Sequence, residues 1–190
     1  MIAVIDHRDS FTHNLVHMLH ELDAVDIFEM TAFTRIEFSK IDALVFSPGP
    51  GRPEDYPESR KLYENARGKI PILGVCLGFQ LILNSEGAEI QRQPRVLHGM
   101  QTSIQFDPDC QSYRKLEPPL RVGRYHSLQV NPESIPEHVN VTAWDDARLI
   151  PLSVEMPSLN IFGFQYHPDS FLTDHGQQIL NNCLSDRLES

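Results

Sequence analysis

The sequence predicts an α/β fold in which a mostly parallel central sheet is flanked by helices and a smaller antiparallel or mixed sheet is appended. In the first half, short apolar runs alternate with stretches of helical periodicity, as in parallel sheets that helices cover on both faces. In the second half, short apolar segments are separated by prolines and turn residues, which is typical of antiparallel strands. The chain has 190 residues, 41% of them hydrophobic, which suits one sizeable core. We therefore expect a single domain over residues 1–190.

In the first half, the apolar runs that predict strands cover residues 2–5, 25–28, 43–46 and 70–75. Apolar residues at helical spacing predict a helix over residues 11–22, and a similar pattern predicts another over residues 56–67. Residues 47–51, Ser-Pro-Gly-Pro-Gly, contain two prolines and two glycines, which suit neither a sheet ladder nor a helix. We expect an irregular loop there.

In the second half, short strands are predicted at residues 102–106, 129–130, 139–144, 150–155 and 161–165. From residue 173 onward the apolar residues return to helical spacing, which predicts a C-terminal helix.

The composition excludes several classes of function. There are 26 Asp and Glu residues against 16 Lys and Arg, a formal charge of −10, which disfavours binding to a nucleic-acid backbone. No stretch approaches the roughly 20 apolar residues that span a bilayer, and the N-terminus lacks the features of a secretory signal. Three scattered cysteines are too few for a disulfide framework. We expect a cytoplasmic protein without nucleic-acid or membrane partners.

Cys76 lies in the most informative segment of the chain. Residues 74–78 read Gly-Val-Cys-Leu-Gly and connect a predicted buried strand to an apolar helical stretch. Glycines two residues before and after a nucleophile indicate a nucleophile elbow, the sharp strand-to-helix turn that exposes a reactive side chain. The start of a helix also favours the thiolate over the thiol. The alternative is a buried structural cysteine at a strand end.

A nucleophilic thiol needs a base, and the base needs an orienting group. His167 follows the predicted strand at residues 161–165, and strand ends are where active sites lie in α/β sheets. Asp169 is close enough in sequence to hold its imidazole in one tautomer. The His-Pro-Asp tripeptide is also compatible with a plain turn. A rival triad through His126 is less favoured, because no acid follows that histidine nearby.

Several segments together resemble the class I, triad-type glutamine amidotransferases. They are residues 47–51 (SPGPG), 74–80 (GVCLGFQ), 125–128 (YHSL) and 165–170 (QYHPDS). Residues 6–15 (DHRDSFTHNL) resemble the opening of the subgroup that serves chorismate-using enzymes, namely anthranilate synthase component II and the amidotransferase subunit of aminodeoxychorismate synthase. The motifs stand in the family's order and cover nearly the whole chain.

The resemblance implies a glutaminase subunit. Cys76 would attack the side-chain amide of L-glutamine to give a γ-glutamyl thioester, with His167 moving the proton and Asp169 orienting His167. It also implies that the ammonia passes to a chorismate-using synthase subunit in a heteromeric complex, for tryptophan or folate biosynthesis.

The family pattern also implies two groups of binding residues. Backbone N–H groups at Gly49 or Gly51 and at Leu77 would form the oxyanion hole. The amino-acid end of glutamine would be held by Gln80, Ser127 and Leu128.

Two positions depart from the family pattern. Asp169 stands where the family usually has Glu, so its carboxylate is one methylene shorter, and we expect a reduced rate rather than lost chemistry. Phe79 stands where the family usually has His, and we expect this change to alter the packing behind the elbow.

Other interpretations stay open at the level of sequence. His13, His17 and His20 recur along the first predicted helix, but without a further ligand at fixed spacing they are expected to be surface groups, so we predict no metal site. No phosphate-binding G-x-x-x-x-G-K-[ST] loop is present, and we predict no cofactor. The alternatives to a glutaminase are a thiol hydrolase or peptidase on the same scaffold and a catalytically silent regulatory subunit.

Overall fold

A computed structural model describes residues 1–29, 36–93, 97–147 and 149–188. Within these residues, a nine-stranded sheet has the strand order β2-β1-β3-β4-β11-β10-β9-β6-β7. Its strands are β1 (Ile2–Asp6), β2 (Val25–Glu29), β3 (Ala43–Phe46), β4 (Ile72–Val75), β6 (Met100–Phe106), β7 (Leu120–Arg124), β9 (Asn140–Asp145), β10 (Pro151–Met156) and β11 (Ile161–Phe164). A separate two-stranded antiparallel sheet pairs β5 (Ile90–Arg92) with β8 (Leu128–Val130).

The large sheet changes from parallel to antiparallel at β11. Strands β2, β1, β3, β4 and β11 pair in parallel, and β11, β10, β9, β6 and β7 pair antiparallel. The predicted fold class is confirmed. The antiparallel strands of the second half mostly extend the central sheet, and the small appended sheet is the β5–β8 pair.

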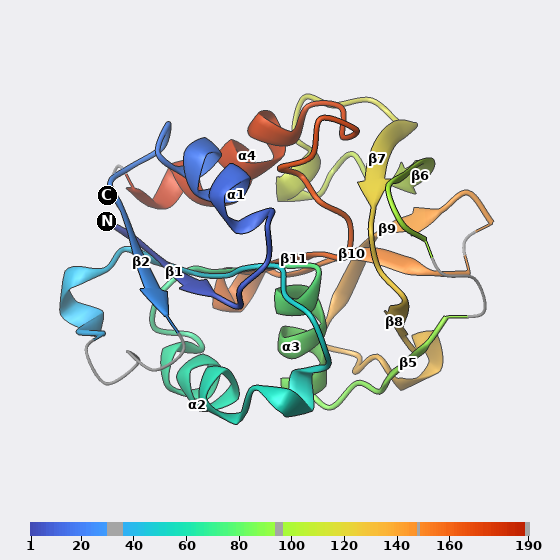
Figure 1. Ribbon diagram of the computed structural model, residues 1–190. Helices are drawn as coiled ribbons and strands as arrows, with labels where there is room; N and C mark the ends of the chain where they lie inside the picture. Colours follow the sequence, from blue (N-terminus) through green and yellow to red (C-terminus); the bar gives the residue numbers. More distant parts are fainter. Residues whose placement is uncertain (30–35, 94–96, 148, 189–190) are drawn as a thin grey trace.

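Helices cover both faces of the parallel half (Figure 1). α1 (Thr12–Leu19) and α4 (Gly176–Leu188) lie on one face, and α2 (Pro57–Ala66) and α3 (Leu77–Ser85) lie on the other. Alternation along β1 divides the core accordingly. Ile2 and Val4 pack with α1 and α4, whereas Ala3 and Ile5 pack with α2 and α3. Short 3₁₀ turns occur at Phe38–Lys40, Pro53–Asp55, Gln111–Tyr113, Pro132–Ser134 and Pro157–Leu159. Among the helices of the described residues, none is both long and apolar enough to cross a membrane.

Element boundaries differ from the predictions where local hydrogen bonding decides them. The predicted strand at residues 70–75 begins only at Ile72, because the N–H of Ile70 still bonds to Ala66 at the end of α2 and Pro71 has no N–H. Strand β7 was not predicted, because its sequence, LRVGR, has two arginines and a glycine. Its pairing with β6, from Met100–Arg124 to Ile104–Leu120, supplies the stability that its composition does not.

The strand order brings distant segments of the chain to one edge of the sheet. β1, β3, β4 and β11 are consecutive parallel neighbours. Their carboxyl ends therefore meet, and the residues that follow them (7, 47–51, 76 and 165–169) gather there.

Candidate active site

Cys76 occupies a strained turn between β4 and α3. Its backbone has φ 53° and ψ −100°, a conformation that is costly for a residue with a side chain. Its N–H donates to the carbonyl oxygen of Phe164, 2.8 Å away. A Cβ at Gly78 would collide with the carbonyl oxygen of Phe46, and one at Gly74 would lie 2.5 Å from the carbonyl oxygen of Gly78. Close packing of strand against helix therefore explains both glycines, and the strain is of the kind that clusters at functional sites.

His167 is buried beside Cys76, with Asp169 behind it. The imidazole Nδ1 lies 3.5 Å from Oδ1 of Asp169, which is longer than a good hydrogen bond. Neither carboxylate oxygen has a hydrogen-bond partner among the described residues. Burial lowers the pKa of His167, but Asp169 and the sulfur of Cys76 together raise that pKa to about 10. The imidazole therefore holds a proton at neutral pH next to the Cys76 sulfur.

Two aromatic rings hold the His167 imidazole in place. The ring centroid of His167 is 4.8 Å from that of Phe11 and 5.0 Å from that of Tyr125. The Tyr125 hydroxyl shares a 2.9 Å hydrogen bond with Ser170 Oγ, and the N–H of His167 donates to Gly123. The orientation of the imidazole thus depends on packing as well as on Asp169.

His126 is also buried in this region, but both of its ring nitrogens are engaged. Nδ1 donates to the carbonyl oxygen of Leu128 at 2.8 Å, and Nε2 accepts from Nε of Arg124 at 3.0 Å. Burial and the positive charge of Arg124 lower its pKa to about 3. These contacts leave no ring nitrogen to serve Cys76, which disfavours the rival triad.

A cavity of about 200 Å³ opens at Cys76. Its lining residues are Asp9, Gly49, Pro50, Gly51, Cys76, Leu77, Gln80, Tyr125, His126, Ser127 and Leu128. The structure therefore gathers all six predicted oxyanion and glutamine-binding residues around the thiol. The buried side chains of His167 and Asp169 lie next to the cavity rather than in its lining.

Asp9 and Tyr125 also line this cavity, although no role was predicted for either of them from the sequence. Both belong to segments that resemble the family, residues 6–15 and 125–128. Their positions within these segments could have indicated a role for Asp9 and Tyr125 from the sequence.

Gln80 is held by a residue for which no role was predicted. Its Nε2 donates to Oε1 of Gln165 at 2.9 Å and to the carbonyl oxygen of Leu128 at 3.3 Å. Nε2 of Gln165 is in turn 3.9 Å from the sulfur of Cys76. Gln165 thus links the end of β11 to both Cys76 and the cavity wall.

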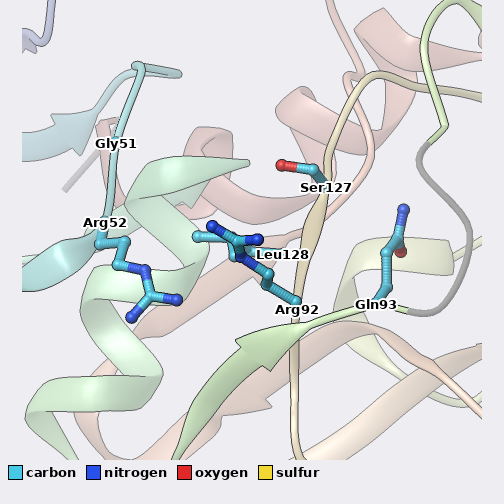
Figure 2. Close-up of a pocket in the computed structure, with 6 residues that line it drawn as sticks. All are labelled: Gly51, Arg52, Arg92, Gln93, Ser127 and Leu128. Atoms are coloured by element: carbon cyan, nitrogen blue, oxygen red, sulfur yellow. The ribbon is translucent and has the colours of Figure 1, made fainter.

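A larger cavity, of about 420 Å³, adjoins the first and shares Gly51, Ser127 and Leu128 with it. Arg52 and Arg92 reach into it from opposite sides, one next to Gly51 and the other from β5 (Figure 2). Cys76, the candidate nucleophile, lines the smaller cavity, which is therefore the candidate site of the chemistry.

The other histidines and cysteines considered from the sequence form no second site within the described residues. His13, His17 and His20 are exposed, and the described residues contain no group of three or more potential metal ligands. Burial raises the pKa of Cys110 to about 12 and that of the Cys183 thiol as well, which makes both poor nucleophiles.

Phe79 is fully buried in α3 against β11. Its Cδ2 lies 3.0 Å from the position that a Cβ would take at Gly163. The side chain therefore packs behind the elbow, away from the cavity lining.

This fold and this site define a class of protein. The chain matches the glutamine amidotransferase class-I family over residues 3–186 and belongs to it. It is 40% identical over 191 residues to anthranilate synthase component 2 of Pseudomonas aeruginosa, covering 97% of this chain and 94% of that protein. It is 37% identical over 187 residues to aminodeoxychorismate synthase component 2 of Escherichia coli, covering 97% and 99%. The dual-named aminodeoxychorismate/anthranilate synthase component 2 of Bacillus subtilis is 38% identical, with 97% and 95% covered.

Solved structures share the fold at lower identity. A glutamine amidotransferase from Thermotoga maritima superposes with a TM-score of 0.76 at 16% identity, covering 100% of this chain and 98% of that one. A glutamine amidotransferase from Methylobacillus flagellatus gives 0.71 at 18% identity, covering 90% and 70%. The predicted family is confirmed, and so is the predicted class of enzyme, a glutamine amidotransferase of the anthranilate and aminodeoxychorismate synthase group.

Proposed function

We propose that residues 1–190 form a single amidotransferase domain that hydrolyses L-glutamine through a thioester on Cys76 and delivers the ammonia to a chorismate-using synthase partner. One observation carries this proposal. The strained Cys76 stands beside the buried His167 at the wall of a cavity of about 200 Å³.

In the first half-reaction, the Cys76 sulfur attacks as the thiolate, its proton having passed to His167, and a C–S bond forms to the side-chain carbonyl carbon of glutamine. The negative charge that develops on the carbonyl oxygen is stabilised by backbone N–H groups of Leu77, which begins α3, and of Gly49 or Gly51. When the tetrahedral intermediate collapses, the C–N bond breaks. His167 gives its proton to the leaving nitrogen, which departs as ammonia.

In the second half-reaction, water attacks the thioester. The now neutral His167 accepts a proton from that water, the C–S bond breaks, and glutamate leaves. Asp169 orients His167 through both steps.

Polar groups along the cavity suit the amino-acid end of glutamine. We assign Gln80, Ser127 and Leu128 to its binding, as the family pattern implies. The Asp9 carboxylate in the same lining complements the α-ammonium group of the substrate.

The partner follows from chemistry and from the relatives. Ammonia is readily protonated in bulk water, so direct delivery to an acceptor enzyme preserves it as a nucleophile. The relatives are named as second components of anthranilate and aminodeoxychorismate synthases. The active site of the partner would decide between anthranilate, for tryptophan, and 4-amino-4-deoxychorismate, for folate. We propose a cytoplasmic location, where reducing conditions keep the three free cysteines as thiols.

The test is glutamate release from glutamine by the purified chain, with and without a chorismate-using synthase subunit and chorismate. We expect release that rises with the synthase and is lost in Cys76→Ser, while Cys110→Ser keeps it. Cleavage of γ-glutamyl peptides that ignores any synthase would favour a thiol hydrolase instead. If the folded protein releases no glutamate with or without a synthase subunit, the result would favour a catalytically silent regulatory subunit.

A further inference from the structure

His7 is a buried titratable residue that the proposed mechanism does not use. It follows β1 directly and is 1% exposed. Its neighbours are Ser47, at the end of β3, and Ser59, in α2. It therefore lies beneath residues 47–51, the loop that carries Gly49 and Gly51.

The hydrogen bonds of His7 determine its tautomer. Nδ1 lies 3.2 Å from the carbonyl oxygen of Ser47, which can only accept, so Nδ1 carries the proton and donates. Nε2 therefore accepts from the Ser59 hydroxyl at 2.9 Å. The backbone N–H of His7 donates to Oγ of Ser47 at 2.9 Å, and that hydroxyl donates to the carbonyl oxygen of Pro48 at 2.8 Å. The neutral imidazole thus satisfies both of its nitrogens and contacts the start of the loop.

The same histidine also contacts the rest of the loop. A Cβ at Gly49 would lie 2.5 Å from Cβ of His7, so the glycine backbone rests directly on the histidine. The imidazole packs edge-on against Tyr56 with centroids 4.9 Å apart. The Tyr56 hydroxyl donates to the carbonyl oxygen of Pro50 at 2.6 Å. His7 and Tyr56 together therefore hold the loop from Ser47 to Pro50.

We propose that His7 is a positioning residue that holds the loop of residues 47–51 so that its backbone N–H groups point into the glutamine cavity. This inference rests on the proposed function, because the loop supplies a donor to the oxyanion hole only if glutamine is the substrate. The imidazole acts in its neutral form. A proton on Nε2 would make that nitrogen a donor and remove the acceptor for Ser59.

The experiment compares His7→Ala with His7→Asn. Both variants keep the Cβ that touches Gly49, but only the asparagine amide can replace the Nδ1–H bond to Ser47. We expect His7→Ala to lower kcat for glutamine by about 100-fold, as for a lost oxyanion donor, with KM within about threefold. His7→Asn should recover kcat to within about tenfold of the wild type. His17→Asn, an exposed substitution on α1, is the matched control.

Two further readouts separate positioning from a general loss of structure. Alkylation of Cys76 by iodoacetamide should keep its rate within about twofold in His7→Ala, because the nucleophile and His167 are untouched. Amide hydrogen exchange across residues 47–51 should accelerate at least about tenfold in His7→Ala but not in the control.

The outcomes discriminate between the two proposals. Any one of three results in His7→Ala would overturn the role of His7. These results are a kcat per folded molecule within about threefold of the wild type, an alkylation rate that falls in parallel with kcat, and unchanged hydrogen exchange across residues 47–51. If the wild type does not hydrolyse glutamine, the proposed function fails. The exchange measurement still decides whether His7 holds the loop.

Discussion

The Asp169 carboxylate does not come within good hydrogen-bonding distance of His167. Asp169 is buried, and its nearest approach to His167 is 3.5 Å. Burying a carboxylate without good hydrogen bonds costs about 1–3 kcal/mol or more. Asp169 holds the His167 imidazole only weakly, and the aromatic contacts of Phe11 and Tyr125 add to its positioning. Residue identity at a single position thus affects both local stability and proton transfer.

A side chain longer by one methylene at position 169 should strengthen the contact with His167. We expect Asp169→Glu to raise kcat for glutamine about 3- to 10-fold, because one charge-assisted hydrogen bond to His167 is worth about 1.5 kcal/mol. Steady-state glutamate release measures the change, with Asp169→Asn as the control that should lower it. Turnover that is unaltered or lower in Asp169→Glu would show that Asp169 is not a weakened orienting residue.

At the scale of elements, the elbow depends on how closely α3 approaches β3 and β4. Two glycines allow this approach, and the backbone of Cys76 takes up the strain of the turn. The apolar side chains of α3 pack in the core with residues of β3, β4 and β11, which stabilises the helix in this position. The position of Cys76 is therefore set by packing between whole elements.

A methyl group added at Gly78 should displace α3. We expect Gly78→Ala to lower the free energy of unfolding by about 3 kcal/mol, because its Cβ would meet the backbone of Phe46, which cannot yield. Urea unfolding measures this, and Ser85→Ala at the end of the same helix is the control. A loss below about 0.5 kcal/mol would mean that the helix relaxes easily and that close packing is not why glycine is needed.

At the scale of the whole molecule, buried histidines should make stability depend on pH. Burial lowers the pKa of His7 to about 4, below its ordinary value of 6.5 in the unfolded chain. Asp6 and Tyr56 are the titratable groups near it. The native state then binds fewer protons than the unfolded state, so stability is lost as the pH falls from 6.5 toward 4.

Between pH 7 and pH 5, His7 alone should therefore reduce the free energy of unfolding by about 2 kcal/mol. Comparing urea unfolding of the wild type and His7→Asn at both pH values isolates this contribution. The pKa of His126 is also lowered, but His126 is present in both proteins, so its contribution cancels in the comparison. Equal losses in the two proteins would show that His7 does not titrate in this way.

Much of the fold could be predicted from the sequence. Apolar runs located β1, β2, β3 and β4, and the glycines around Cys76 indicated the elbow, because periodicity and residue type are local properties of the chain. Strand β7 could not be predicted, because its stability comes from pairing with β6 rather than from its own residues.

For the candidate site, the sequence determined which residues to consider, and the tertiary structure decided how they meet. Because β1, β3, β4 and β11 are neighbours, His7 lies under the loop of residues 47–51 and Gln165 beside Gln80. The engaged nitrogens of His126 and the gap at Asp169 likewise depend on contacts between separate segments. Such contacts depend on strand order and on the distances between side chains of separate segments. A sequence pattern carries local periodicity and residue chemistry, whereas packing between distant segments decides these distances.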